Sequence, residues 1–275
     1  MKKILLGVAA AVALAGCVSD NKNTDKKLDE LAKSVNELKD LVKAGGAGAG
    51  RQAPRPMRPQ ADPAKTYAVP VEGDPFEGPA DAKITIVKGY EYACPFCEKV
   101  RPTLAELRKK YPNDVRVVHK QFVVHPQVAT AAALAICAGS KQGKFPKMDE
   151  LLWEKAFKTR QFDEAHLEEL AKEAELDVNR YKADVKGDCQ AFIQKDQMEL
   201  VNFGVGATPA FFINGRFLSG AQPMPAFEAL VQEELKKADE RIAAGTSKAD
   251  YYKTWVIAKG EKKLEAPKAE AVPAK

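Results

Sequence analysis

The segment Cys-Pro-Phe-Cys at residues 94–97 constrains the fold of this chain more than any other feature. It follows Lys83 to Tyr90, where alternating Ile residues predict a strand, and it precedes Glu98 to Tyr111, where apolar residues recur at helical spacing. A second β-rich run, Asp114 to Val124, comes next. We therefore expect a strand, helix, strand unit with the first cysteine at the start of the helix.

The rest of the domain predicts an α/β fold with a helical insertion. Pro126 to Phe203 is helical in pattern, with breaks near Gly143, Asp177 and Gly187. A hairpin with Asn-Gly at its turn is expected over residues 209–218. A long helix over residues 223–244 follows it.

The two cysteines have the chemistry of a redox pair. A thiol at a helix N-terminus is stabilised as the thiolate, which is the form that attacks a disulfide, so Cys94 is the expected nucleophile. Pro95 starts the helix without leaving an amide donor unpaired. Cys97 is then placed to resolve a mixed disulfide on Cys94. Half of a zinc site is the alternative, but the chain has no second Cys-x-x-Cys and only three His residues. We expect no metal and no cofactor beyond the dithiol itself.

A second motif, Gly-Val-Gly-Ala-Thr-Pro-Ala-Phe-Phe-Ile-Asn-Gly at residues 204–215, lies more than a hundred residues further on. Together with Cys-Pro-Phe-Cys it resembles the DsbA-like branch of the thioredoxin superfamily, over roughly Lys83 to Leu235. The resemblance implies a thioredoxin-like fold and thiol-disulfide exchange. It also implies that Pro209 is cis and faces the dithiol, and that the backbone of Thr208 pairs with an extended substrate strand. An ordinary strand-initiating proline is the alternative.

Three positions near the dithiol are compared with the residues of the same family. Strong oxidants of the family carry His between the cysteines, so Phe96 predicts a milder oxidant. Glu91 matches an acidic position common in relatives, and either relays a proton for Cys97 or is a solvent-exposed residue at the strand end. Lys88 stands where many relatives have a buried Glu, and we assign it no catalytic role.

Four further residues are given structural roles. Cys137 and Cys189 lie in the insertion, and the resemblance implies a structural disulfide between them, with two buried free thiols as the alternative. His125, which precedes a Pro as in the family, and His119 on a predicted strand are expected to be structural rather than catalytic.

The N-terminus predicts export and a lipid anchor. Residues 1–16 combine two Lys with an apolar run too short to span a bilayer, which is typical of a signal peptide. The sequence Leu-Ala-Gly-Cys that ends at Cys17 resembles the lipobox of bacterial lipoproteins. Val18 is not the Asp of the inner-membrane retention signal, so we expect a periplasm-facing lipoprotein of the outer rather than the inner membrane. Disulfides persist in such a compartment.

Residues 17–43 are interpreted as a stalk. Leu28, Leu31, Val35, Leu38 and Val42 recur at the spacing of a short coiled coil, so we expect a homo-oligomer through residues 28–42. A single amphipathic stalk that lies on the membrane or on its own domain is the alternative.

The other boundaries follow from composition. Residues 44–65 have the Gly, Ala and Pro content of a flexible linker, residues 66–260 form the catalytic domain, and residues 261–275 are expected to be a disordered tail.

These observations predict dithiol–disulfide exchange with exported substrate proteins, as an oxidase or an isomerase. A membrane redox partner would recycle the dithiol. A lipid-anchored holdase or scaffold that binds unfolded chains without redox turnover is the alternative function. The net charge of +5 is spread among acidic residues, so nucleic-acid binding is not expected.

Overall fold

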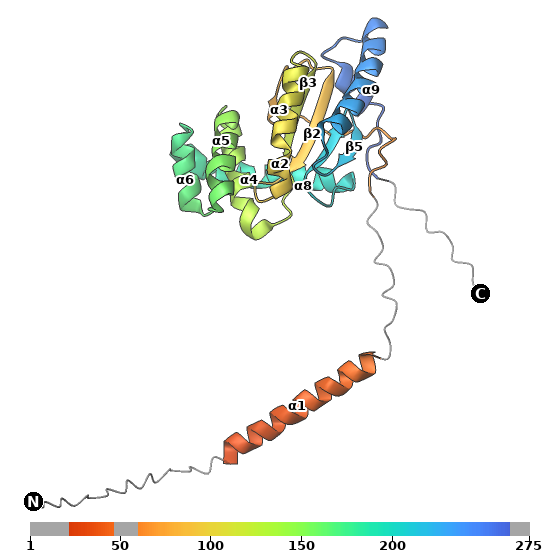
Figure 1. Cartoon of the computed structure of the whole chain (residues 1–275). Coiled ribbons are helices and arrows are strands. Elements are labelled where there is room, and N and C mark those ends of the chain that lie inside the picture. The colour runs from red at the N-terminus through yellow and green to blue at the C-terminus, as the bar shows by residue number, and fades with distance from the viewer. Residues whose placement is uncertain (1–21, 47–59, 265–275) are drawn as a thin grey trace, which may run out of the picture. The chain divides into compact units, whose positions relative to one another are not determined.

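The computed structural model describes residues 22–46 and 60–264 (Figure 1). The chain divides into two compact units, residues 1–57 and residues 58–275. The predicted signal peptide and Cys17 lie outside the described residues. Within the described ranges, no helix is both long enough and apolar enough to cross a membrane.

The first unit is described by one helix, α1 (Lys22–Gly46). It covers the predicted stripe, and three of the stripe's side chains, Leu28, Leu31 and Val35, are exposed. Apolar side chains in a single row leave apolar surface in water, and no other described residue of this unit covers them. Self-association through this face stays a prediction.

The second unit is built around a five-stranded sheet in the order β1-β3-β2-β4-β5. Its strands are β1 (Phe76–Glu77), β2 (Ile84–Tyr90), β3 (Val115–Gln121), β4 (Ala210–Ile213) and β5 (Arg216–Ser219). Strands β2 and β3 are parallel, as expected for strands joined by a helical crossover, and the other pairs are antiparallel. The predicted α/β, thioredoxin-like fold with a helical insertion is confirmed.

The β4–β5 hairpin turns at the predicted Asn-Gly pair. Asn214 and Gly215 both have positive φ, 45° and 84°. This is the backbone that a two-residue hairpin turn needs, and Asn and Gly adopt it most readily. The Asn214 side chain also accepts from the amide of Thr85 at 2.8 Å and donates to the carbonyl of Lys83 at 3.0 Å, which holds the turn against β2.

The helix after the dithiol differs from the prediction of one continuous element. It consists of α2 (Pro95–Lys99) and α3 (Arg101–Lys110), with a break at Val100. The cause is Pro102, which has no amide hydrogen and therefore cannot continue the hydrogen-bond ladder of α2. A short helix carrying Cys97 thus precedes a separate helix that packs on the sheet.

The insertion forms a helical body beside the sheet (Figure 1). Its elements are α4 (Pro126–Lys141), α5 (Phe145–Leu151), the π-helical turn η1 (Leu152–Phe157), α6 (Glu164–Glu173), α7 (Val178–Lys186) and α8 (Asp188–Asn202). Cys137 on α4 and Cys189 on α8 are joined by a disulfide, with their Cα atoms 5.7 Å apart. The bond links the helix that opens the insertion to the helix that returns the chain to the sheet.

Four apolar clusters form the core of this unit, and three of them surround the sheet and the insertion. One face of the sheet packs on α3 and on α9 (Met224–Ala243), and the opposite face packs on α8. The third cluster fills the insertion and includes Tyr90, Tyr92, Cys94 and Cys97. The dithiol therefore lies where the sheet meets the insertion.

The edges of the domain differ from the predicted boundaries at residues 65 and 261. Ala61 is buried, and the amide of Asp62 donates to the hydroxyl of Tyr67 at 2.8 Å, so the domain begins before residue 66. At the other end, Glu261 pairs with Tyr67 and the amide of Leu264 donates to the carbonyl of Asn202 at 2.9 Å. The predicted linker and tail are therefore too long, because main-chain pairing at a sheet edge leaves no trace in composition. Residues 47–59 and 265–275 lie outside the described residues.

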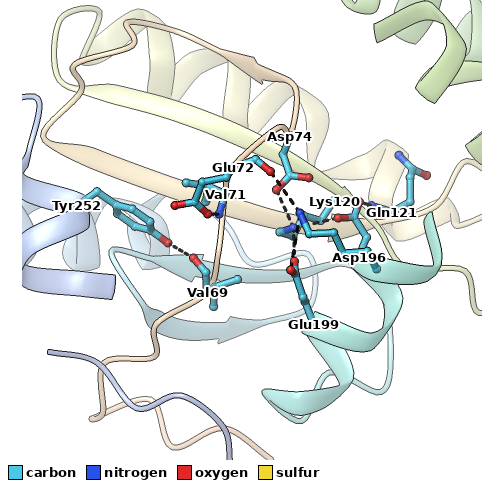
Figure 2. A network of polar contacts seen from close by, with 10 residues as sticks. Val69, Val71, Glu72, Asp74, Lys120, Gln121, Asp196, Glu199 and Tyr252 are labelled. Carbon is cyan, nitrogen blue, oxygen red and sulfur yellow. Dashed lines mark hydrogen bonds and ion pairs between the residues drawn. The ribbon is translucent and has the colours of Figure 1, made fainter. Parts of the chain in front are cut away.

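The segment that follows α9 packs on the domain through the π-helical turn η2 (Tyr252–Ile257). Tyr251, Tyr252 and Val256 are buried there, and the hydroxyl of Tyr252 donates to the carbonyl of Val69 at 2.8 Å (Figure 2).

A buried ion-pair network joins the start of the domain to β3 and α8 (Figure 2). The ammonium of Lys120, which has no exposed surface, lies 2.6 Å from Asp74, 2.9 Å from Asp196 and 2.7 Å from Glu199. Asp196 also accepts from the amide of Gln121 at 2.9 Å. A buried ammonium is stable in the charged form only with such partners.

Candidate active site

The two cysteines of the Cys-Pro-Phe-Cys motif lie at the start of α2, and both are free and buried. Cys94 caps the helix: its Sγ accepts from the amide of Cys97 at 3.3 Å. Pro95 is the first helical residue, and Phe96 is 60% exposed. Cys94 retains 4% of its surface and Cys97 none, so Cys94 is the thiol that another molecule reaches first.

The second motif lies against the first. The peptide bond between Thr208 and Pro209 is cis, and the thiol of Cys94 donates to the carbonyl oxygen of Thr208 at 3.4 Å. Residues 114 positions apart in the sequence therefore meet at the reactive sulfur. Main-chain groups of a chain laid beside Thr208 would pass close to Cys94.

The two thiols have opposite acidities. The pKa of Cys94 is lowered to about 6, first by its hydrogen bond with Cys97 and then by Thr208 and the amides of Cys97 and Phe96, against the opposing effect of burial. Burial, followed by the hydrogen bond and charge of Cys94, raises the pKa of Cys97 far above its ordinary value. At neutral pH Cys94 is mostly thiolate and Cys97 is a thiol, which is the division of roles that exchange requires.

Glu91 is fully buried, so the alternative of a solvent-exposed strand-end residue is wrong. Its carboxylate accepts from the amides of Val124 at 2.7 Å and His125 at 3.0 Å, and it contacts the ring of His125. Its backbone carbonyl lies 3.4 Å from the amide of Cys94. Glu91 thus fixes the entry to α4 beside the dithiol. A proton relay to Cys97 stays a prediction.

His125 has a contact that its sequence position did not predict. Its ring is exposed, and its hydrogen bond with Glu91, together with the charge of Glu91 and a smaller effect of Cys94, raises its pKa. His119 instead is buried on β3, where its Nε2 lies 3.1 Å from Glu77. Burial, followed by the nearby charge of Lys88, lowers the pKa of His119.

The sequence reasoning missed the surroundings of Lys88. This residue is 2% exposed in the middle of the sheet, and its Nζ lies 3.9 Å from the centre of the Tyr90 ring. It lines a cavity of about 400 Å³ under α2 and α3, with Glu98 and Arg101 on the same wall. The signals in the sequence were a Lys inside a mainly apolar strand and its position, where many relatives have a buried Glu.

A second hollow, of about 600 Å³, lies near the loop that precedes Thr208. It is lined on one side by Phe122, Val123 and Val124, and on the other by residues of α8 and by Gly204 to Gly206. Val124 and Val201 are exposed there, so an apolar side chain of another polypeptide has a surface to cover.

Among residues 22–46 and 60–264, no group of three or more His, Cys, Asp or Glu side chains is arranged to hold a metal ion. The expectation of a dithiol that works without a further cofactor stays a prediction.

The sheet with its helical insertion, the capped dithiol and the cis-proline that faces it define the DsbA-like class of thiol-disulfide oxidoreductases in the thioredoxin superfamily. The family model described as thioredoxin matches residues 71–233, and the chain belongs to that family.

Solved structures with similar folds have been found for this chain. BdbD from Bacillus subtilis superposes with a TM-score of 0.58 at 23% identity, covering 65% of this chain and all of that one, and it supports the fold. ScsC from Proteus mirabilis is 25% identical with a TM-score of 0.52, and covers 79% of this chain and 99% of that one.

Among curated proteins, part of the Na(+)/H(+) antiporter NhaA of Herminiimonas arsenicoxydans is 32% identical over 185 residues. That match covers 65% of this chain and 27% of the antiporter, so the chain spans less than a third of the length of this relative.

Proposed function

We propose that this protein exchanges disulfides with exported proteins through Cys94 and Cys97. The observation that carries the proposal is the position of the Cys94 sulfur, which caps α2 and lies 3.4 Å from the carbonyl of Thr208, before the cis-proline. A reactive thiolate and a backbone edge that can bind an extended chain meet at this point.

The reaction has two steps. When the dithiol is oxidised, a substrate thiolate attacks the Sγ of Cys94, the bond between the cysteines breaks, and Cys97 leaves with the electron pair. A second substrate thiolate then attacks the substrate sulfur of the mixed disulfide and releases Cys94 as the thiolate. The substrate loses two electrons and the dithiol gains them. Isomerisation starts instead from reduced Cys94, which attacks a substrate disulfide and is later released by another substrate thiol.

Single variants test the chemistry. Cys94→Ser is expected to abolish both dithiol oxidation and the refolding of a scrambled disulfide protein. Cys97→Ser is expected to accumulate mixed disulfides with the substrate, because the neighbouring thiol that resolves them fastest is missing. Full activity of both variants in both assays would exclude a redox enzyme. If the double variant still suppresses aggregation of an unfolded protein, the holdase function is the better assignment, and the apolar hollow near residues 204–206 is the surface to examine.

The direction of exchange depends on the reduction potential and on the oligomeric state. Phe96 is exposed and offers the thiolate no charge, which supports a milder oxidant than a relative with His at that position. Pairing of α1 stalks would place several dithiols together, which favours isomerase activity. Sedimentation of the mature chain, with and without residues 22–46, measures this contribution. A monomer in both cases would favour the oxidase.

The location and partners belong to the same proposal. Lipidation at Cys17 would anchor the protein to the outer membrane, facing the periplasm, and a membrane redox partner would restore the oxidation state of the dithiol. Radiolabelled palmitate tests the anchor: it should label the wild type but not Cys17→Ala. Membrane fractionation then distinguishes the outer from the inner membrane.

A further inference from the structure

Arg160 is an exposed arginine whose guanidinium lies next to the dithiol segment. Its Nη1 donates to the carbonyl oxygen of Ala93 at 3.1 Å, and Ala93 directly precedes Cys94. The sulfur of Cys94 is a few covalent bonds further along the chain, so this donor lies within about 9 Å of the reactive atom. Arg160 follows η1 in the helical insertion and thus reaches the dithiol from outside both sequence motifs.

The backbone of Arg160 has a conformation that suits Gly better than Arg. Its φ is 59°, and it closes the helix end with two hydrogen bonds: its own amide donates to the carbonyl of Phe157 at 3.2 Å, and the amide of Gln161 donates to that of Ala156 at 3.1 Å. The same pair of bonds closes other helices of this domain around a Gly with positive φ: Gly143, Gly204 and Gly245. This left-handed conformation is costly for a residue with a Cβ, so an arginine retained here is expected to have a use for its side chain.

Glu175 supports this interpretation of Arg160. It has the same φ of 59° and the same pair of closing bonds, at the end of α6. Its carboxylate lies 2.9 Å from the ammonium of Lys144, so its side chain is used in an ion pair. Arg160 instead forms no ion pair with a described residue, which leaves its charge available to a carboxylate of another molecule.

Aromatic rings hold the guanidinium in place. Its Cζ lies 4.1 Å from the centre of the Phe157 ring, and the rings of Phe157 and Trp153 pack with their centres 5.4 Å apart. Trp153 is fully buried and packs on Tyr92, with ring centres 4.7 Å apart. The carbonyl of Ala93 takes one N–H group of the guanidinium, and the other N–H groups donate to no described residue. A planar fork that is already fixed in this way loses little freedom when it binds a carboxylate.

We propose that Arg160 is a specificity-determining residue: its guanidinium binds the carboxylate of an acidic side chain beside the substrate cysteine. This rests on the proposed function and names the substrates that the dithiol prefers, which are cysteines in acidic stretches of exported proteins. The ion pair forms when the substrate chain lies beside Thr208 and brings its cysteine to Cys94. The exchange reaction itself is the one described above.

The test uses short peptides with a single Cys and the oxidised, full-length mature protein. The peptides differ only in the residue beside the Cys, which is Glu, Gln or Lys. The thiolate of each peptide attacks the sulfur of Cys94 and displaces Cys97. Each rate constant is divided by that of the same peptide with glutathione disulfide, which removes the effect of the neighbouring residue on the peptide thiol.

In the wild type we expect the Glu peptide to react about fivefold faster than the Gln peptide at low salt, and the Lys peptide to react more slowly than both. High salt should reduce the difference, because it screens an exposed ion pair. Equal rate constants for the Glu and Gln peptides in the wild type would overturn the proposal.

Arg160→Gly removes the guanidinium and introduces the residue that this backbone prefers. In this variant the preference for Glu over Gln is expected to fall below about twofold. Glu175→Gly makes the same kind of change at the same φ, at the end of α6, and is the matched control that should keep the wild-type preference. Arg160→Lys keeps the charge without the planar fork and should retain part of the preference.

The pattern among the peptides separates recognition from a structural role. A preference that persists in Arg160→Gly would overturn the proposal, because another cation would then be responsible. An equal slowing of all three peptides in Arg160→Gly would also overturn it, because Arg160 would then act on the dithiol and not on the substrate. Absence of reaction between the wild type and every peptide would instead refute the proposed function.

Urea unfolding checks why the arginine is retained. Arg160→Gly should unfold at the same urea concentration as the wild type or at a higher one, since Gly adopts this φ without strain. A clearly lower midpoint would show that Arg160 is retained for stability and would overturn the proposal. If Arg160→Gly does not fold, Arg160→Asn repeats the peptide measurements, because Asn also tolerates this φ.

Discussion

Lys88 and Lys120 are both fully or nearly fully buried lysines on neighbouring central strands, and their surroundings are opposite. Because side chains alternate along a strand, Lys88 projects to the face covered by α3, whereas Lys120 projects to the face covered by α8. Lys120 meets three carboxylates within 2.9 Å (Figure 2). Lys88 meets the ring of Tyr90.

The two lysines show how the surroundings of a buried ammonium decide whether its pKa is raised or lowered. Three carboxylates exceed the charge of one ammonium, so they raise the pKa of Lys120 and hold three segments together. Burial outweighs the charges of Asp149 and Glu77 and lowers the pKa of Lys88. The ammonium of Lys120 therefore forms ion pairs, whereas that of Lys88 forms none with a described residue and lies over the ring of Tyr90.

The largest expected effect is on the structural lysine. Lys120→Met would leave Asp74, Asp196 and Glu199 without a cation, and removal of one partner from a buried ion pair costs about 3–5 kcal/mol. Urea unfolding of the wild type and the variant at neutral pH measures this loss. A loss below about 1 kcal/mol would show that the network does not hold the domain together, and the comparison with Lys88 would fail.

Asp74 gives the network a pH signature. Burial, followed by the charge of Asp196, raises the pKa of Asp74 to about 7, above its value in the unfolded chain. Between about pH 4 and 7 the folded state therefore binds a proton that the unfolded state has lost, so this group's stabilising contribution falls as the pH rises, by at most about 1.4 kcal/mol per pH unit. Asp74→Asn should remove this decline. Parallel stability curves for wild type and variant would contradict it.

Lys88→Met should change stability in the opposite sense. Replacing an unpaired buried ammonium by an apolar side chain is expected to leave the domain equally stable or about 1 kcal/mol more stable at neutral pH. The folded pKa of Lys88 is lowered, so the wild type gains stability as the pH rises toward the unfolded lysine value near 10.4. The advantage of the variant should therefore shrink on the alkaline side. Urea titrations at neutral and alkaline pH measure it, and an advantage that grows with pH would contradict a buried charged lysine.

The smallest expected effect is on Cys94. Thiolate absorbance near 240 nm should titrate with a midpoint of about 6 in the wild type. Lys88→Met should move the midpoint slightly upward, because a cation near the dithiol is lost. Lys120→Met, studied at a temperature at which it is folded, should leave the midpoint unchanged, since that charge is neutralised. Equal shifts in both variants would remove the distinction between the two lysines.

Much of the fold was predictable because its signals are local. The alternation of Ile84 and Ile86 identified β2, and Asn-Gly identified the hairpin turn. The separation of α2 from α3 was also available in the sequence, in Pro102, but the helical spacing of Val100, Leu104 and Leu107 concealed it.

The reacting residues of the candidate site could be predicted from the sequence, but several contacts around them could not. The spacing of Cys94 and Cys97 and the Thr-Pro step at 208–209 can be recognised directly in the sequence. The contact of Glu91 with His125 is not, because the two residues are 34 positions apart and neither lies in a motif. Exposure of Glu91 could not be judged either, since a residue at a strand end is buried or exposed according to what the following helix covers.

By itself the sequence determined the class of the domain, the reactive pair and the order of its elements, since helix and strand periods and turn residues act over a few neighbours. The tertiary structure decided which buried lysine is neutralised. Asp74 and Asp196 are separated from Lys120 by 46 and 76 positions, and only the packing of α8 and the N-terminal segment on one face of the sheet brings them together. On the other face Lys88 forms no ion pair with a described residue, and its ammonium contacts the ring of Tyr90 instead.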